Sequence, residues 1–225
     1  MKLNLSNIPA VTTTIDANVT DRSYKNNYYA KYYYAYGIRN TFGLSIDPLT
    51  GNLWDTENGE DKYDEINLVN PGFNSGWIRV MGPISRNNDN NNYTKNKLQE
   101  ELVNFPGSRY TDPAFSWKQE IGVTDIEFFN SSKLGTKFKN NIFVGDINYG
   151  NLYYFEINSS RTGINLNAAF KSHGLSDLVA DANNETSPII FGTNFGRITD
   201  IETGPDGFLY ILSYEDGKLY RILPT

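Results

Sequence analysis

The 225-residue chain contains no cysteine. Disulfide bonds, thiolate nucleophiles and zinc–thiolate sites are therefore excluded. Basic residues are also few, since 20 Lys and Arg face 26 Asp and Glu, which gives a net charge of −6 and a pI near 4.9. Phosphate binding needs a basic surface, so nucleic acid is a poor partner. Cations and neutral polyols remain compatible with this charge.

Long apolar runs are missing as well. No stretch approaches the roughly 18 residues that a membrane span requires. The start, Met1 to Asn7, lacks the apolar core of a signal peptide, so none is expected in this chain. The sequence has a single histidine, His173. A lone histidine in a helix-like segment is more often a surface or packing residue than a base, and it receives no catalytic role.

Aromatic residues, by contrast, are frequent. They make up 14% of the chain, and 19 Gly and 9 Pro are spread along it. This mixture favours strands joined by many short turns, because aromatic side chains pack well on pleated surfaces. No Gly/Pro-rich linker divides the chain, which indicates a single domain. Residues 1–27 have no strong pattern and are predicted to be a disordered or edge segment.

A strand–turn–strand unit recurs along the rest of the chain. One copy runs from Gly43 to Trp54 and another from Ile201 to Leu212, with Asp, Pro and Gly in both turns. A looser copy covers residues 141–157, and a last hairpin turns at Asp216-Gly217. Hairpins repeated every 40–50 residues or so are typical of β-propeller blades. A β-sandwich with coincidental turns is the alternative, but sandwiches carry no such repeat. Residues 28–225 are therefore predicted to form an all-β, propeller-type domain.

Two neighbouring stretches carry residues suited to binding. Arg39 and Asn40 follow Gly37 at the expected start of a strand. Arginine offers a planar fork for carboxylate or quinone oxygens, and asparagine adds one donor and one acceptor. The second stretch is the turn at Asn58-Gly59, where exposed backbone carbonyls are suitable ligands for Ca²⁺.

Negative charge lies close to this turn, at Asp61, Asp64 and Glu65. The spacing leaves two interpretations open. In one, these groups belong to a cation site. In the other, Arg39 pairs with a structural carboxylate and the acidic loop is merely solvated.

The order of the motifs resembles that of a known family. The chain has Gly37-Ile38-Arg39-Asn40, then the first hairpin, then Glu57-Asn58-Gly59, Asp64-Glu65-Ile66-Asn67-Leu68 and Gly72-Phe73-Asn74-Ser75-Gly76-Trp77. This succession is similar to the signature of the soluble quinoproteins of the glucose/sorbosone dehydrogenase family. The last repeat, from Gly196 to Tyr210, resembles the final repeat of that family, so the resemblance covers residues 33 to 223 or so.

The resemblance implies a six-bladed propeller that holds pyrroloquinoline quinone beside a calcium ion. Carried over by position, Arg39, Asn40 and Arg197 match residues that hold the cofactor. Gly59 and Glu60 match the two residues whose carbonyls bind calcium. The implied reaction is oxidation of a sugar or polyol hydroxyl, in which a histidine takes the proton and the quinone takes the hydride. The family's histidine precedes the matched region, so the catalytic residue is unknown here.

Several positions depart from the family pattern. Glu60 replaces the usual proline, which removes a fixed φ from the loop. Thr199 stands where a second arginine is often present. Ile38, Thr41 and Phe42 stand where His, Pro and Gln are common, which indicates a divergent branch.

Length gives a further expectation, because 225 residues hold about four blades rather than six. Three explanations follow: a fragment, blades supplied by another chain, or a reduced non-enzymatic relative. The first is preferred, with the chain inactive alone and the parent protein exported, as the family implies. The alternative function is a non-catalytic propeller that binds a protein or glycan, for which the Tyr-rich edge at Tyr28, Tyr29 and Tyr32 to Tyr34 is a candidate surface.

Overall fold

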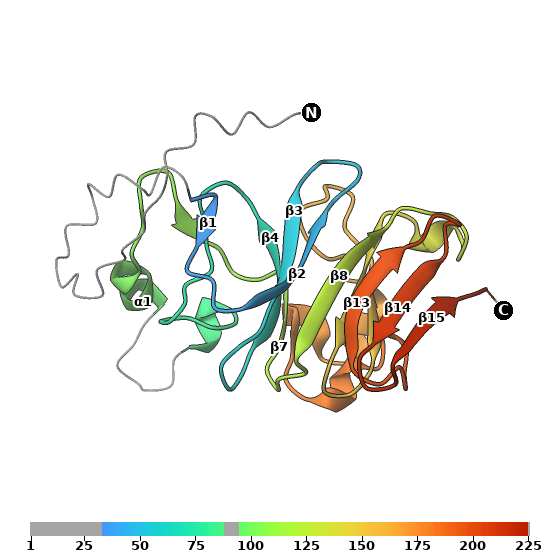
Figure 1. The fold of residues 1–225 in the computed structure, drawn as a ribbon. Helices are drawn as coiled ribbons and strands as arrows, with labels where there is room; N and C mark the ends of the chain where they lie inside the picture. The colour runs from blue at the N-terminus through green and yellow to red at the C-terminus, as the bar shows by residue number, and fades with distance from the viewer. Residues whose placement is uncertain (1–32, 88–94, 225) are drawn as a thin grey trace.

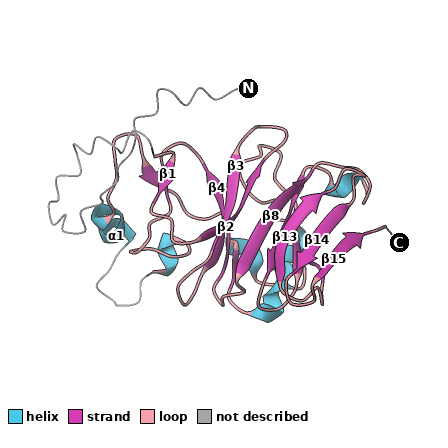
Figure 2. Ribbon diagram, in the orientation of Figure 1, coloured by secondary structure: helices cyan, strands magenta, loops and turns pink. Residues whose placement is uncertain are grey.

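The computed structural model describes residues 33–87 and 95–224. Strands dominate this part of the chain, and helices are short (Figures 1 and 2). The strands are β1 (Ala35–Tyr36), β2 (Thr41–Ile46), β3 (Leu53–Glu57), β4 (Asp64–Val69), β5 (Phe73–Asn74), β6 (Arg109–Tyr110), β7 (Phe115–Trp117), β8 (Val123–Phe129), β9 (Asn141–Asp146), β10 (Leu152–Phe155), β11 (Val179–Ala180), β12 (Ile190–Gly192), β13 (Ile198–Thr203), β14 (Leu209–Ser213) and β15 (Lys218–Ile222). The α-helices are α1 (Lys95–Glu101) and α2 (Ala168–Ser172).

Three of the sheets have the arrangement of propeller blades. Blade 1 is β2-β3-β4-β7 with β11 added at its outer edge, blade 2 is β8-β9-β10-β12, and blade 3 is β13-β14-β15. Consecutive strands pair antiparallel within each blade. The inner strands β2, β8 and β13 lie next to one another (Figure 1). The predicted incomplete propeller is therefore confirmed as an arc of blades. A fourth, smaller sheet, β1-β5-β6, has parallel strands.

The first hairpin shows how the sequence fixes a blade. Asp47 directly follows β2 and is fully buried, and its carboxylate accepts the Leu49 N–H at 2.9 Å and the Thr50 hydroxyl at 2.8 Å. Gly51 closes the turn with φ +77°, a left-handed conformation that favours glycine. Arg161 then pairs with the Asp47 carboxylate through two hydrogen bonds of 2.7 and 2.8 Å. The turn is thereby tied to the Ile157–Ile164 region beside blade 2.

The apolar cores lie between the blades. The larger core joins blade 1 to blade 2 and contains Trp54, Ile66, Ile126 and Phe128 among its buried side chains. A second core joins blade 2 to blade 3 through residues that include Phe143 and Ile211. Face-to-face packing of this kind removes one face of each neighbouring sheet from water, and it supplies the main stabilisation of the arc.

Hydrogen bonds also link the inner strands of successive blades. The backbone N–H of Ile201 donates to the Asp125 carboxylate at 2.8 Å, and that of Thr203 donates to Glu127 at 3.1 Å. At the preceding junction, the N–H of Phe128 donates to the Ser45 hydroxyl at 3.2 Å. Side chains on one inner strand thus accept donors from the backbone of the next.

Other predictions have mixed outcomes. The helix-like segment around His173, from Lys171 to Pro188, forms the end of α2, two 3₁₀ turns and β11 rather than one helix. The predicted edge segment 1–27 lies outside the described residues, as do Tyr28, Tyr29 and Tyr32. In the described part of the chain, no helix is long and apolar enough to span a membrane.

Candidate functional site

The predicted binding residues lie in loops at one end of the blades. Arg39 and Asn40 directly precede β2, and Gly59 and Glu60 follow β3. Because β2 and β3 are antiparallel, the start of one lies beside the end of the other, and Thr41 pairs with Glu57. The backbone confirms the closeness of the two loops, since the N–H of Asn58 donates to the carbonyl of Asn40 at 2.9 Å.

Arg39 is held on three sides. Its backbone N–H donates to Glu57 Oε1 at 2.5 Å, and its Nη1 donates to the carbonyl of Asn58 at 3.1 Å. The guanidinium lies over the Trp77 ring, 5.5 Å from the ring centroid, which is within the range of a cation–π contact. Among the described residues no carboxylate lies within salt-bridge distance of this side chain. The expected alternative of an ion pair with a structural carboxylate is therefore not observed.

The Gly59 loop is fixed by the buried carboxylate of Asp64. Asp64 Oδ1 accepts the N–H of Gly59 at 2.9 Å, while Oδ2 accepts the N–H groups of Ile121 at 2.8 Å and Gly122 at 2.7 Å. One side chain therefore ties the loop to the segment that leads into β8. Gly59 itself is buried, and a Cβ at this position would lie 2.0 Å from the Lys62 carbonyl oxygen. Glu60, the second predicted calcium ligand, is exposed.

Only part of the acidic stretch is solvated. Asp61 is exposed, but Asp64 and Glu65 are buried, so the expectation of a merely solvated acidic loop is wrong for these two residues. The physical reason is that β4 is covered on both faces, and its burial extends over Asp64, Glu65, Ile66 and Asn67.

Three carboxylates form a buried cluster beneath the site: Asp55, Glu57 and Glu65. Ser75 donates to Glu57 at 2.6 Å, and the N–H of Gly82 donates to Glu65 at 2.5 Å. Burial raises the pKa of Glu57 to about 7 and that of Asp55 to about 6, and it raises the pKa of Glu65 well above its usual range. Burial thus favours the protonated form of each of the three carboxyl groups.

Arg197 lies at the corresponding position of another blade. It directly precedes β13 and is exposed, and its carbonyl accepts the N–H of Tyr214 at 2.8 Å. No contact joins its side chain to Arg39 or to the Gly59 loop within the described residues. Thr199, which replaces the family's second arginine, is exposed on β13.

His173 is exposed at the C-terminal end of α2. Its Nδ1 lies 2.9 Å from the Ala169 carbonyl oxygen and 3.1 Å from the Ser172 hydroxyl. These are local contacts at a helix end, away from the loops that hold the other candidates.

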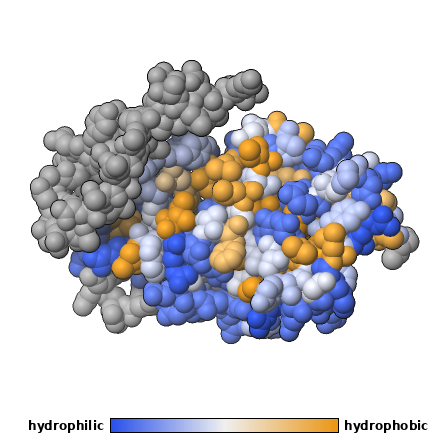
Figure 3. All heavy atoms as spheres, viewed as in Figure 1, coloured by the Kyte–Doolittle hydropathy of each residue, from blue (hydrophilic) through white to orange (hydrophobic). Residues whose placement is uncertain are grey.

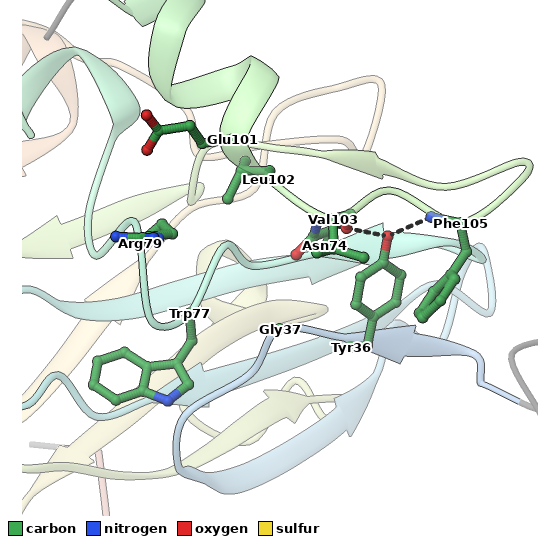
Figure 4. Close-up of a pocket in the computed structure, with 9 residues that line it drawn as sticks. All are labelled: Tyr36, Gly37, Asn74, Trp77, Arg79, Glu101, Leu102, Val103 and Phe105. Atoms are coloured by element: carbon green, nitrogen blue, oxygen red, sulfur yellow. Dashed lines mark hydrogen bonds between the residues drawn. The ribbon is translucent and has the colours of Figure 1, made fainter. Parts of the chain in front are cut away.

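A surface cavity of about 350 Å³ lies beside Trp77. Its lining consists of Tyr36, Gly37, Asn74, Trp77, Arg79, Glu101, Leu102, Val103 and Phe105 (Figure 4). Tyr36 links two parts of this lining, because its hydroxyl donates to the Val103 carbonyl at 3.0 Å and accepts the N–H of Phe105 at 3.1 Å. The half-exposed Tyr33 ring lies tilted by 53° against Phe105, with 6.2 Å between the ring centroids.

Two residues of the site were missed as functional candidates. Trp77 provides the aromatic face for Arg39, and Glu57 holds the backbone of Arg39 from below. Both residues lie within the motifs that carry the family resemblance, so the sequence marks their positions. Assigning their roles requires the fold, because 38 positions separate Trp77 from Arg39 along the chain.

The family profile described as Glucose / Sorbosone dehydrogenase matches residues 14–221. This match covers most of the chain and includes every candidate binding residue. The chain belongs to the glucose/sorbosone dehydrogenase family. Within this family, it is similar to the aldose sugar dehydrogenase YliI of Escherichia coli K12, with 28% identity over 193 residues.

Solved structures in the family neighbourhood agree with the fold. The soluble aldose sugar dehydrogenase of Escherichia coli, in its apo form, matches with a TM-score of 0.57 and 26% identity, over 85% of this chain and 47% of that chain. The pyranose dehydrogenase PQQ domain of Coprinopsis cinerea, in its holo form, matches with a TM-score of 0.51 and 16% identity, over 83% of this chain and 54% of that one. The latter likeness concerns the fold alone.

The match covers a larger share of this chain than of the relative. The match to YliI spans 85% of this chain but 43% of that relative. The chain thus spans less than half the length of the curated family member that it matches.

Proposed function

We propose that this chain forms one half of the cofactor site of a quinoprotein that oxidises a hydroxyl group of an aldose or related polyol. The observation that carries the proposal is the position of Arg39, which is held between the Asn58 carbonyl and the Trp77 ring directly beside the Gly59 loop. Family membership, and the names of the related aldose sugar dehydrogenase and PQQ domain, support pyrroloquinoline quinone as the cofactor.

The chemistry of the side chains fits such a group. Pyrroloquinoline quinone carries several carboxylates, and Arg39 and Arg197 offer planar cationic groups directly before the inner strands β2 and β13, between which β8 lies. Asn40 adds an exposed amide beside Arg39. For calcium, the carbonyls of Gly59 and Glu60 are hard oxygen ligands, and the exposed Asp61 adds negative charge nearby.

Local packing makes the Gly59 loop a pre-organised element. The hydrogen bond from Gly59 to Asp64 and the close approach of the Lys62 carbonyl, which leaves no room for a Cβ at position 59, restrict the loop. This rigidity compensates for the missing proline at position 60. The role of the chain is therefore to position cofactor and cation, and the quinone, when bound, would supply the hydride acceptor.

The isolated chain is expected to be inactive as a dehydrogenase. Its one histidine is exposed at the end of α2, and the family resemblance assigns the base to a region that precedes the matched motifs. Export of the parent protein is part of the same proposal, because family members work outside the cytoplasm.

The test is calorimetric titration of pyrroloquinoline quinone into the purified chain, with and without Ca²⁺. We expect calcium-dependent binding that is weakened at least tenfold by Arg39→Ala, a loss of about 1.4 kcal/mol or more. Arg109→Ala is the matched control, because this arginine is exposed on β6, outside the candidate site. No binding to the wild-type chain, or equal binding to the Arg39→Ala variant, would overturn the proposal.

A further inference from the structure

One face of blade 1 carries a buried layer of polar side chains. The layer consists of Asp55 and Glu57 on β3, Glu65 and Asn67 on β4, and Ser116 on β7. Pairing across the strands places Asp55 opposite Asn67, and Glu65 opposite both Glu57 and Ser116, so all five lie on the same face. Ser75, which directly follows β5 and is 4% exposed, packs onto this layer through its hydroxyl.

Glu57 is the member of the layer that contacts the candidate site. Its Oε1 accepts the backbone N–H of Arg39 at 2.5 Å, and its Oε2 accepts the Ser75 hydroxyl at 2.6 Å. Among the described residues, no Lys or Arg forms an ion pair with this carboxylate. Its orientation therefore depends on hydrogen-bond donors rather than on a neighbouring cation.

Strand β2 adds no charge to this face. Its exposed side chains are Phe42, Leu44 and Ile46, each 63% exposed, and Figure 3 shows apolar surface over this region. The Thr41 hydroxyl donates to Asp55 at 2.9 Å and does not reach Glu57. The side-chain donors that hold Glu57 therefore come from Ser75 and Asn67.

Of these two donors, Ser75 makes the short hydrogen bond. Asn67 Nδ2 lies 3.4 Å from Glu57 Oε2 and 3.2 Å from Glu65 Oε2, so it is shared between two carboxylates. Glu65 does not depend on Ser75, because the N–H of Gly82 donates to its Oε1 at 2.5 Å and the Ser75 hydroxyl lies 3.4 Å from its Oε2. Loss of the Ser75 hydroxyl would thus leave Glu65 anchored and Glu57 without its short side-chain contact.

Ser75 also belongs to the segment that supports Arg39 from the other side. The N–H of Ser75 donates to the Tyr36 carbonyl at 3.1 Å, and the N–H of Trp77 donates to the Gly37 carbonyl at 2.8 Å. Figure 4 shows Trp77 beside Gly37. One short segment therefore provides both the ring that meets the Arg39 guanidinium and the hydroxyl that orients Glu57.

We propose that Ser75 is a positioning residue of the candidate site, which acts through Glu57 to hold Arg39 against Trp77. A hydrogen bond to a carboxylate is stronger than one between neutral groups, and a buried carboxylate that loses such a donor turns toward those that remain. Without the hydroxyl, Glu57 is left with the more distant Asn67 amide, and Oε1 loses the position from which it holds the Arg39 N–H. The inference rests on the proposed function only for the ligand that Arg39 receives.

The first test needs no cofactor, because Trp77 reports the position of Arg39. The chain has three tryptophans, and Trp54 and Trp117 are 0% and 1% exposed, so collisional quenching by acrylamide acts mainly on Trp77. Ser75→Ala should raise the quenching constant toward that of Arg39→Ala, since the guanidinium no longer covers the ring. Ser75→Thr, which keeps the hydroxyl, should restore the wild-type value.

Ser116→Ala is the matched control. Ser116 is a fully buried serine of the same layer, and its hydroxyl has no hydrogen-bond partner within the part of the chain that the structure describes. This variant should be quenched like the wild-type chain. Ser75→Cys, which keeps nearly the same volume with a weak donor, replaces Ser75→Ala if circular dichroism shows that the alanine variant does not fold. A folded Ser75→Ala or Ser75→Cys variant that is quenched like the wild-type chain would overturn the proposal.

Calorimetry separates a positioning role from general loosening of the site. Ser75→Ala should weaken binding of pyrroloquinoline quinone by about three- to tenfold. Its affinity for Ca²⁺ alone should not change, because Asp64 rather than Glu57 fixes the Gly59 loop. Equal losses for both ligands would contradict the positioning role. If the quinone does not bind the wild-type chain, the proposed function fails, and the quenching comparison still decides the role of Ser75.

Discussion

Glu57 connects the candidate site to the interior of blade 1. One of its carboxylate oxygens holds the backbone N–H of Arg39, and the other accepts the Ser75 hydroxyl. Its neighbour Glu65 is also buried, and no cation within the described residues pairs directly with either carboxylate. Such groups keep their protons to a higher pH when folded than when unfolded, so their burial makes the stability of the chain depend on pH.

The pH dependence has a definite sign. The pKa values of Glu57, about 7, and Asp55, about 6, lie above their unfolded values near 4, so the folded chain binds more protons between these limits. The free energy of unfolding should therefore fall as pH rises from about 4 to about 7. Glu57→Gln should flatten this decline by on the order of 1–3 kcal/mol, as measured by urea unfolding. Glu100→Gln should leave the decline unchanged, and an equal slope in the wild-type chain and the Glu57→Gln variant would contradict the prediction.

Gly59 offers a second test at this scale. A methyl group at position 59 would meet the Lys62 carbonyl oxygen at 2.0 Å, so the loop must move to accept it. Gly59→Ala should lower the free energy of unfolding by about 1–3 kcal/mol, the usual cost of overpacking, and should weaken calcium binding in the calorimetric titration. Gly163→Ala is the control, because the nearest contact for its methyl group is the end of the Asn158 side chain at 3.3 Å. Unchanged stability of Gly59→Ala would show that the loop is not fixed.

The sequence predicted the positions of the candidate binding residues better than the burial and contacts of the side chains around them. Arg39, Asn40, Gly59 and Glu60 were predicted to lie together, and hairpin pairing places them together. The burial of Asp64 was not predicted, because an Asp after an acidic loop resembles solvated sequence. Its four backbone donors come from Gly59 and from residues 121–123, and only the fold brings the latter to it.

At the scale of elements, the junctions between inner strands govern how the blades stack. Glu127 accepts both the N–H and the hydroxyl of Thr203, and both interactions bridge blades 2 and 3. Glu127→Ala leaves these donors without a partner in a partly buried position. The free energy of unfolding should fall by about 1–3 kcal/mol, measured by denaturant titration. Glu156→Ala, at an exposed position after β10, should change stability by less than about 0.5 kcal/mol.

Strand prediction succeeded where local sequence specifies the pairing. The turns of the hairpins β2-β3, β9-β10, β13-β14 and β14-β15 all lie within the predicted units, although several strands extend a few residues beyond them. The two-residue strands β1, β5, β6 and β11 were not predicted. Their pairing is parallel, between segments far apart along the chain, and two residues carry no alternation that a sequence pattern can reveal.

At the scale of the whole molecule, the sequence predicted an incomplete propeller of about four blades. Residues 33–87 and 95–224 form four sheets, of which three are blades and one is the small parallel sheet β1-β5-β6. Chain length alone could not distinguish four blades from three blades and a small sheet, because the segment containing α1 and the small sheet uses as many residues as a blade. The match to YliI covers 43% of that relative, so this sequence corresponds to less than half of its length.

The donors that join successive blades are backbone N–H groups, which every residue except proline provides. Asp125 and Glu127 accept these backbone N–H groups. An acidic pair of this kind can therefore bind a neighbouring inner strand with almost any side chains. Contacts of this kind make the blades modular. Duplication or loss of a blade during evolution would leave a usable junction at the new boundary, so families built in this way can change their blade number without redesigning the interface between neighbours.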